Sequence, residues 1–295
     1  MTLYNQITSN RRRTTVLVVL FVVFIGVLGW FVGGVYGDSY AGLALAAVAI
    51  CVMNLLAFFV GDKVALATAG AHAIEKKDNP YVYRLVENLC ITAGIPIPKI
   101  YIIEDAAMNA FATGRNAEHA SIAVTTGLID GLENEELEGV IAHELSHIKN
   151  RDILVATLVV VLVGVVSLIG DFFLRMRIRG GRRSEGSAAL VLVLVGLLLA
   201  ILSPLIAKLI QFAISRQREY LADASGSLLT RYPEGLAKAL EKIAANEQPM
   251  LKANHATAHL FFEDPFARRT SKGTLSYHLF STHPPIEERI KRLRT

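Results

Sequence analysis

The sequence predicts a mainly α membrane protein, in which four hydrophobic helices accompany a soluble α+β domain with a small sheet. Of the 295 residues, 53% are apolar and 19% are charged, and the mean hydropathy of +0.43 is too high for an ordinary water-soluble domain. The apolar excess is concentrated in four charge-free runs, each about as long as a bilayer core requires. These runs are Val16–Tyr36, Ala41–Val60, Ile153–Gly170 and Ala188–Ala207. The rest of the chain carries every charged residue, at a density typical of a globular domain.

The positions of these runs predict four consecutive parts. Residues 1–61 form an N-terminal tail with two transmembrane helices, and residues 62–152 form the first part of the soluble domain. Residues 153–214 form a hydrophobic helix pair with a basic connection, and residues 215–295 form the second part of the soluble domain.

Basic residues predict the orientation in the membrane. Arg11–Arg13 precede the first run, whereas the connection Gly37–Tyr40 contains no Lys or Arg. The positive-inside rule therefore places the soluble domain on the cytoplasmic side of the cell (inner) membrane. A removed signal peptide is the alternative for the first run, although its apolar stretch is longer than a cleaved signal needs. Five arginines within Arg175–Ser187 disagree with a plain four-span arrangement, so the last two runs either cross fully or form a hairpin that does not.

Composition also bounds the partners. The basic clusters lie beside apolar runs rather than among aromatic residues, which predicts contact with a lipid bilayer and no nucleic-acid partner. The two cysteines, Cys51 and Cys90, are too few for a disulfide framework.

Within the soluble part, turn residues separate a helix from three short strands. Asp78-Asn79-Pro80 predicts a helix start, and apolar residues recur at helical spacing from there to about Thr92. Strands are predicted at Lys99–Ile103, Asn109–Thr113 and Ser121–Thr126. Four glutamates between residues 133 and 138 then predict the N-terminus of a second helix, where the helix dipole favours negative charge.

That second helix contains His143-Glu144-Leu145-Ser146-His147. Side chains four residues apart lie on one face of a helix, so both imidazoles can bind one tetrahedral metal ion. Glu144 directly follows the first histidine and can reach a metal-bound water without being a ligand. The alternative is two ordinary helix histidines beside a surface glutamate. His255 and His259 are also four apart but have no acidic residue between them, so we expect no second metal site there.

A catalytic zinc site needs a third protein ligand, and the best candidate is Glu219. Asp223 lies four residues further on the same predicted helix face, where its carboxylate can accept a hydrogen bond from a ligand imidazole and fix its tautomer. The alternative is a solvated charged face containing Arg216, Arg218, Glu219 and Asp223. Both candidate ligand segments lie one to two helical turns beyond an apolar run, which predicts a site beside the cytoplasmic headgroups.

Four motifs, taken in order, resemble those of HtpX-type membrane zinc metalloproteases, heat-shock quality-control enzymes related to the CAAX prenyl proteases and belonging to the gluzincins. They are residues 143–147, Arg216–Asp223, Asn109-Ala110-Phe111-Ala112-Thr113-Gly114 and Ser281-Thr282-His283-Pro284-Pro285. The resemblance implies a gluzincin-like fold and an endopeptidase that degrades misfolded or damaged membrane proteins, with one zinc ion per chain.

The resemblance also implies roles for individual residues. It makes Glu219 the third zinc ligand, His283 a group that helps to hold the tetrahedral intermediate, and Arg289 a residue that orders the site. It makes Asn109, Ala110, Phe111 and Ala112 part of an edge strand that binds substrate backbone by strand addition, for which the physical basis is general.

The chemistry implied is hydrolysis by water. Zinc polarises the scissile carbonyl and a water molecule, and Glu144 takes the proton and passes it to the leaving nitrogen. One rival is an intramembrane protease, but the charged residues directly after His147 place the motif outside the bilayer core. The other alternative function is a non-catalytic metal-binding membrane scaffold or metal carrier, in which Glu144 would have no chemical role.

Overall fold

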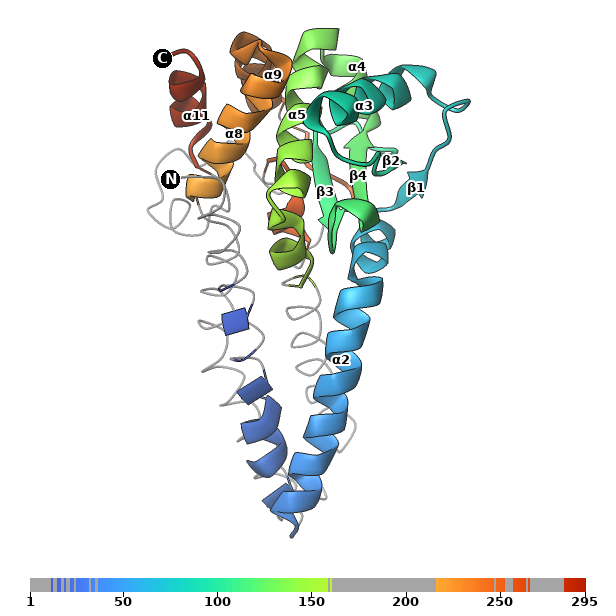
Figure 1. The fold of residues 1–295 in the computed structure, drawn as a ribbon, viewed down its shortest axis with the longest axis vertical. Helices are drawn as coiled ribbons and strands as arrows, with labels where there is room; N and C mark the ends of the chain where they lie inside the picture. The colour runs from blue at the N-terminus through green and yellow to red at the C-terminus, as the bar shows by residue number, and fades with distance from the viewer. Residues whose placement is uncertain are drawn as a thin grey trace.

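A computed structural model describes residues 37–158, 160, 216–246, 248–252, 257–263, 265 and 284–295, together with part of residues 12–34. It shows a head, formed by a small sheet and the helices around it, above a long stem that contains helix α2, Ser39–Thr68 (Figure 1). His283 and the fourth apolar run lie outside the described residues, as does most of the third.

The sheet has four strands in the order β1-β2-β4-β3. The strands are β1 (Ala71–Ala73), β2 (Lys99–Ile103), β3 (Ala110–Gly114) and β4 (Ala120–Thr125). β2 and β4 pair in parallel, whereas β1 and β3 pair antiparallel to their neighbours. The three predicted strands are present within one residue of their expected bounds, and β3 lies at an edge of the sheet as expected. β1 was not predicted, because three residues are too few for a periodic signal.

Helices cover the sheet because each presents an apolar face to it. α3 (Pro80–Ala93) begins where Asn79 accepts a hydrogen bond from the amide of Val82, and it ends at Gly94 in the left-handed region with φ 69°. The short helix α4 (Thr126–Gly131), which was not predicted, follows β4 directly. α5 (Asn134–Lys149) then begins with a capping box between Glu133 and Glu136, at the predicted position.

The C-terminal part of the chain supplies a second group of helices. They are α8 (Arg216–Thr230), α9 (Pro233–Ala245) and α11 (Ile286–Leu293), with a short 3₁₀ turn at Ala258–Leu260. Another 3₁₀ turn, Ala117–His119, connects β3 to β4. α5 lies between the sheet on one side and α8, α9 and α11 on the other (Figure 1). This central position places α5 in contact with both halves of the soluble domain.

Alternation along the strands divides the core between the two faces of the sheet. Ile122 and Ala112 face a cluster with α3 and α5, whereas Phe111 and Ala123 face a second cluster with the C-terminal end of α2. Because α2 packs under the sheet through buried Ala65, the stem joins the head directly.

The hydrophobic runs are described only in part. Residues 25–31 of the first run are helical, and the second run forms most of α2, which continues past Val60 to Thr68. No single helix in the described part of the chain has the length and hydropathy of a bilayer span. α2 consists of two parts, Ser39–Met53 and Phe58–Thr68, which are joined at a bend of 66°. Only the two parts together have the length and hydropathy of a bilayer span.

Candidate metal centre

The two histidines of α5 direct their Nε2 atoms toward the same position. Nε2 of His143 and Nε2 of His147 lie 3.1 Å apart, one helical turn from each other. His143 is buried and His147 is partly exposed. The predicted helix face therefore exists and presents two imidazole nitrogens side by side.

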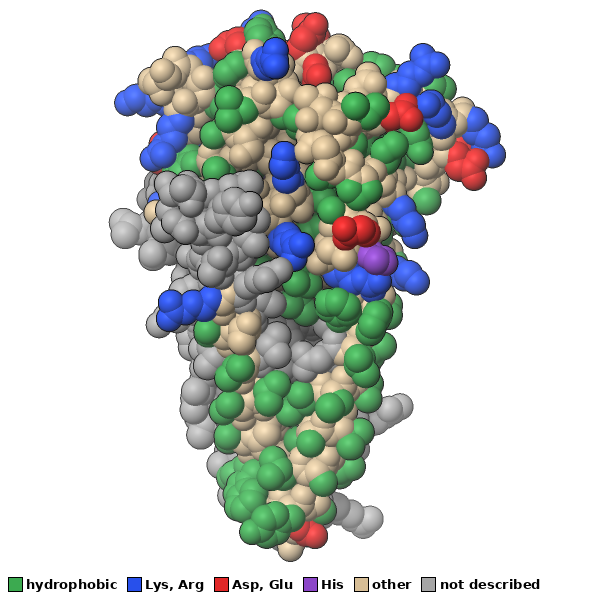
Figure 2. All heavy atoms as spheres, in the orientation of Figure 1, with side chains coloured by type: hydrophobic (Ala, Val, Ile, Leu, Met, Phe, Trp, Pro, Cys, Tyr) green, Lys and Arg blue, Asp and Glu red, His purple; other side chains and the backbone are tan. Residues whose placement is uncertain are grey.

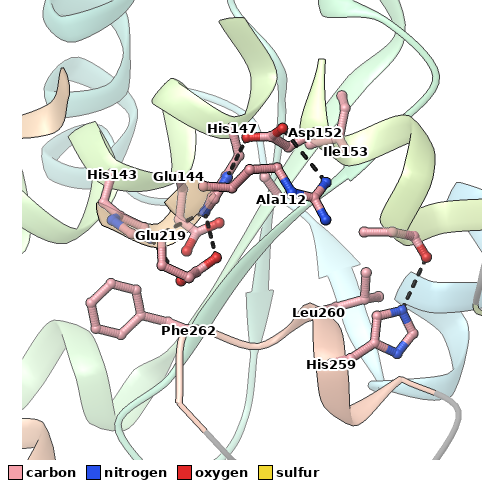
Figure 3. A pocket seen from close by; sticks show the side chains of 12 residues that line it. Ala112, His143, Glu144, His147, Asp152, Ile153, Glu219, His259, Leu260 and Phe262 are labelled. Carbon is pink, nitrogen blue, oxygen red and sulfur yellow. Dashed lines mark hydrogen bonds and ion pairs between the residues drawn. The ribbon is translucent and has the colours of Figure 1, made fainter. Parts of the chain in front are cut away.

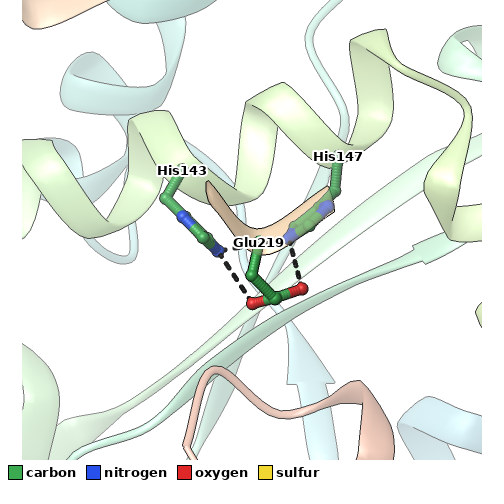
Figure 4. Close-up of side chains that lie close together, drawn as sticks. All are labelled: His143, His147 and Glu219. Atoms are coloured by element: carbon green, nitrogen blue, oxygen red, sulfur yellow. Dashed lines mark hydrogen bonds and ion pairs between the residues drawn. The ribbon is translucent and has the colours of Figure 1, made fainter. Parts of the chain in front are cut away.

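α8 brings the third donor from 72 residues further along the chain. The carboxylate of Glu219 lies with Oε2 3.8 Å from Nε2 of His143 and Oε1 3.6 Å from Nε2 of His147 (Figure 4). Gly226 permits this close approach of α8 to α5, because a Cβ there would lie 2.9 Å from the backbone nitrogen of His143. The alternative of a solvated charged face is wrong, since Glu219 and Asp223 are only 6% and 3% exposed.

The donor set fits zinc. Ligand atoms of His143, His147 and Glu219 all lie within 4.8 Å of one another, and among the described residues they form the one group of this kind. Zinc–ligand bonds of about 2.0–2.1 Å in tetrahedral geometry separate two donors by about 3.3 Å. The separations of 3.1, 3.8 and 3.6 Å bracket that value. Two imidazoles and one carboxylate leave the fourth position open, as in a catalytic rather than a structural zinc site.

Nδ1 of each histidine contacts a carboxylate, and each carboxylate in turn contacts an arginine. Oδ1 of Asp223 lies 2.9 Å from Nδ1 of His143, and Arg289 on α11 binds Asp223 through Nη2 and Nε at 2.7 and 3.0 Å. Oδ2 of Asp152 lies 3.0 Å from Nδ1 of His147, and Nη1 of Arg218 lies 3.7 Å from Oδ1 of Asp152. Each imidazole is thus held through Nδ1, with Nε2 turned toward the metal position.

The electrostatic surroundings differ between the two histidines of the metal-free protein. Burial lowers the pKa of His143 to about 4, against the opposing effect of Asp223. Burial also disfavours a charged His147, but the hydrogen bond to Asp152 and the charge of Glu219 outweigh it and raise the pKa to about 9. For Asp223, burial is outweighed by the charge of Arg289 and the contact with His143, so its pKa falls to about 2. Asp223 is therefore ionised at neutral pH.

The three ligands line one wall of a pocket (Figure 3). Glu144 lies in the same pocket beside the ligands, 2% exposed, which is the position expected of a general base. Ala112 of β3 lines it as well, so the edge strand reaches the metal centre. The remaining wall is formed by Asp152, Ile153, Ala156, Arg218, His259, Leu260 and Phe262.

The other residues of the proposed substrate strand lie beside this pocket. The side chain of Asn109 bonds to the backbone of Glu263, and the carbonyl of Ala110 accepts a hydrogen bond from the amide of Phe262. Phe111 points to the opposite face of the sheet, where it packs edge-on against Phe261.

Sequence reasoning missed Asp152 and Arg218 as parts of the site. Asp152 was interpreted only as one of the charges that exclude the motif from the bilayer. The available signal in the sequence was its position, five residues after His147. In the structure, Arg151 adopts φ 59°, a left-handed conformation that is uncommon outside glycine. The turn at Arg151 brings Asp152 back against the histidine. Arg218 gave no signal, because its burial depends on the packing of α8.

A buried His-His-Glu ligand set, with a glutamate after the first histidine and an edge strand beside it, defines a zinc metallopeptidase. The comparisons agree. The sequence model of Peptidase family M48 matches residues 76–295. A protein named Protease HtpX homolog from Thermoanaerobacter pseudethanolicus is 44% identical over 299 residues, covering 100% of this chain and 98% of its own. A protein of the same name from Streptococcus pyogenes is 42% identical over 300 residues, covering 99% of each chain.

The chain therefore belongs to peptidase family M48 and, within it, to the HtpX proteases. Its fold also resembles the crystal structure of S. mikatae Ste24p, with a TM-score of 0.52 and 17% sequence identity. That match covers 94% of this chain and 62% of the other, and it concerns the fold alone. The family resemblance seen in the sequence is confirmed, and the protein is a zinc-dependent protease rather than a metal carrier.

Proposed function

We propose that this zinc metalloprotease is a membrane-anchored endopeptidase that degrades misfolded or damaged membrane proteins from the cytoplasmic side. The observation that carries the proposal is the junction of the metal centre with an apolar stem. α2 packs under the sheet whose edge strand lines the metal pocket. A substrate held in a bilayer would therefore meet the site where it leaves the membrane.

The surface of the stem supports contact with lipid. Large apolar side chains along α2 are exposed, with Leu45, Val48 and Leu55 at 73%, 63% and 59%. Figure 2 shows charged side chains gathered over the head, whereas the visible surface of the stem along α2 is mostly apolar. An apolar surface of this extent has no favourable contact with water. At the junction, the guanidinium of Arg115 lies 5.3 and 5.1 Å from the ring centres of Phe58 and Phe59, a placement suited to the headgroup region.

The proposed domain organisation follows the hydrophobic runs. The membrane anchors are residues 1–61 and 153–214. The protease domain is formed jointly by residues 62–152 and 215–295. Reporter fusions at Gly180 test this part, because a cytoplasmic signal there requires a hairpin or an even number of crossings before it. A periplasmic signal requires the third run to span the membrane.

Zinc held by His143, His147 and Glu219 would supply electrophilic activation of the scissile carbonyl and of a water molecule. Glu144 takes the proton of that water and later delivers it to the leaving nitrogen. Asp223 and Asp152 hold His143 and His147 in the tautomer that presents Nε2, and Arg289 fixes Asp223 from behind. His283, on the precedent of the resembling family, would stabilise the developing oxyanion.

The proposed substrate strand is Asn109, Ala110, Phe111 and Ala112. The amide ladder to β4 uses the inward-facing groups of β3, so alternate residues turn their peptide groups outward. An extended peptide that pairs with this edge would pass along the wall of the pocket that contains the metal ligands.

The decisive experiment compares Glu144→Gln with the unaltered protein, both purified in detergent and loaded with zinc. We expect one zinc per chain in both, and casein hydrolysis at least about 100-fold slower in the variant. Glu135→Gln, an exposed change on the same helix, is the matched control and should retain activity. Full activity of Glu144→Gln would remove the general base, and loss of zinc from it would make Glu144 a structural residue.

A further inference from the structure

The outer edge of β3 is largely occupied by the protein itself. Asn109 uses its carbonyl to bind Thr125 of β4, so by alternation Ala110, Ala112 and Gly114 turn their peptide groups away from the sheet. The amide and carbonyl of Gly114 both contact the hydroxyl of Thr157, at 3.1 and 3.2 Å. One end of this edge is therefore closed by a side chain.

The other end is closed by residues 257–263, which we call the strap. The amide of Phe262 donates to the carbonyl of Ala110 at 2.8 Å. The side-chain amide of Asn109 binds both backbone groups of Glu263, donating to its carbonyl at 2.9 Å and accepting from its amide at 3.2 Å. These backbone contacts are independent of the side chains of the strap, as in strand addition.

After the 3₁₀ turn Ala258–Leu260, two consecutive side chains of the strap lie on opposite faces of the sheet. Phe261 packs with Phe111 on one face of the sheet, with ring centres 5.0 Å apart. Phe262 turns to the opposite face, where its ring centre lies 5.0 Å from that of His143 and 4.7 Å from the guanidinium of Arg289. Phe261 has extended dihedral angles (φ −68°, ψ 148°), so the chain is extended where it leaves the 3₁₀ turn and reaches β3.

We propose that residues 257–263 are an internal pseudosubstrate that occupies the substrate edge of β3 and must leave before a protein substrate can pair there. The proposal rests on the proposed function, in which Asn109–Ala112 bind substrate. A substrate strand would need the carbonyl of Ala110 and the side-chain amide of Asn109. Both groups are bound to Phe262 and Glu263, so substrate and strap exclude each other.

The position of Phe262 also defines what a competitor must offer. Its ring is buried in the pocket between a zinc ligand and Arg289. A peptide that replaces the strap leaves that space to be filled, so an aromatic or large apolar side chain followed by an extended segment fits best. Segments of this kind are buried in folded proteins and become accessible on unfolding. The strap would therefore select unfolded apolar segments and keep the site closed to folded surfaces.

The first test is hydrogen exchange of the zinc-loaded full chain carrying Glu144→Gln, with and without a saturating synthetic peptide that contains two adjacent phenylalanines. Displacement predicts that amides 262 and 263 exchange at least about tenfold faster with the peptide, while the amide of Ala112 exchanges more slowly. Slower or unchanged exchange at 262 and 263, together with protection of Ala112, overturns the pseudosubstrate but keeps the substrate strand. No protection of Ala112 overturns the substrate strand itself, and the strap proposal with it.

The second test separates the backbone bond from the side chain in the active enzyme. Phe262→Pro removes the amide that binds Ala110, whereas Phe262→Leu keeps that amide beside an apolar side chain. Because a self-occupied site raises the apparent KM by the inverse of its open fraction, we expect a KM for the peptide about tenfold lower in the proline variant than in the leucine variant, with similar kcat. Equal KM values overturn the proposal. If the proline variant does not fold, the exchange experiment decides, since it uses the native strap.

Discussion

Oδ1 of Asp223 lies 2.9 Å from Nδ1 of His143, so a carboxylate on α8 holds a ligand on α5 from the side opposite to the metal position. Asp152 does the same for His147 at 3.0 Å. The two ligands therefore do not depend on their own helix alone for orientation. Each is fixed by a charged group from a different segment of the chain.

Asp223→Asn should weaken zinc binding while leaving the ligand set intact. A carboxylate that accepts a hydrogen bond from a ligand imidazole raises the basicity of the ring, and its loss typically costs about 10–100-fold in metal affinity. Competition with a chromophoric chelator measures the change. Asp130→Asn, at an exposed position of α4, serves as the control. An affinity equal to that of the unaltered protein would show that Asp223 has only a packing role.

Zinc binding near neutral pH should release a proton from His147. Its pKa of about 9 in the metal-free protein means that the ring is charged below that pH, whereas a ligand imidazole must be neutral. The apparent zinc affinity should therefore rise about tenfold per pH unit from pH 7 toward pH 9. Calorimetry in two buffers of different ionisation enthalpy counts the protons. A pH-independent affinity over this range would contradict the raised pKa.

The same pKa predicts how the stability of the metal-free protein changes with pH. A pKa raised from 6.5 to about 9 means that the folded state binds the proton more tightly than the unfolded state does. That contribution is complete below pH 6.5 and is lost as the pH rises through about 9. Denaturant unfolding of the chelator-treated protein should give a lower free energy of unfolding at pH 9.5 than at pH 6. The difference between the two pH values should be smaller in Asp152→Asn.

Arg289→Ala should destabilise the protein strongly. The side chain is fully buried, and its removal leaves the carboxylate of Asp223 buried without its cation, which typically costs about 3–5 kcal/mol. Arg289→Lys should recover part of the loss, because an ammonium group keeps the charge but not the two-point contact. The shift in the unfolding midpoint measures both. Lys291→Ala, an exposed change on α11, should have little effect.

Gly226→Ala should loosen the metal centre without touching a ligand. The added Cβ would lie 2.9 Å from the backbone nitrogen of His143, so α8 must move away from α5 and carry Glu219 with it. Overpacking of this kind costs about 1–3 kcal/mol, and zinc affinity should fall in parallel. Leu228→Ala, on the exposed face of α8, is the comparison. Zinc content and unfolding midpoint equal in both variants would mean that the helices adjust at no cost.

The sequence predicted what local spacing can specify. The two histidines lie one helical turn apart, so their shared face follows from helix geometry alone, and the acidic N-terminus of α5 and the three strands follow from similar local patterns. The need for a third ligand had already made Glu219 the best candidate, and the resemblance of the motifs then supported it and indicated the protease class correctly. The proposed roles of His283, Asn109 and Arg289 came from the resemblance alone and remain predictions.

Only the tertiary structure decided which distant groups meet. Glu219 reaches the histidines because Gly226 lets two helices approach closely, and Arg289 completes the network from the last helix of the chain. The strap was invisible to pattern reasoning for the same reason, whereas Asp152 reaches His147 through the local left-handed turn at Arg151. Periodicity reports how a segment divides its side chains between core and surface, but it carries no information about which buried segment lies opposite. That choice is made by packing, backbone pairing and charge neutralisation over the whole domain.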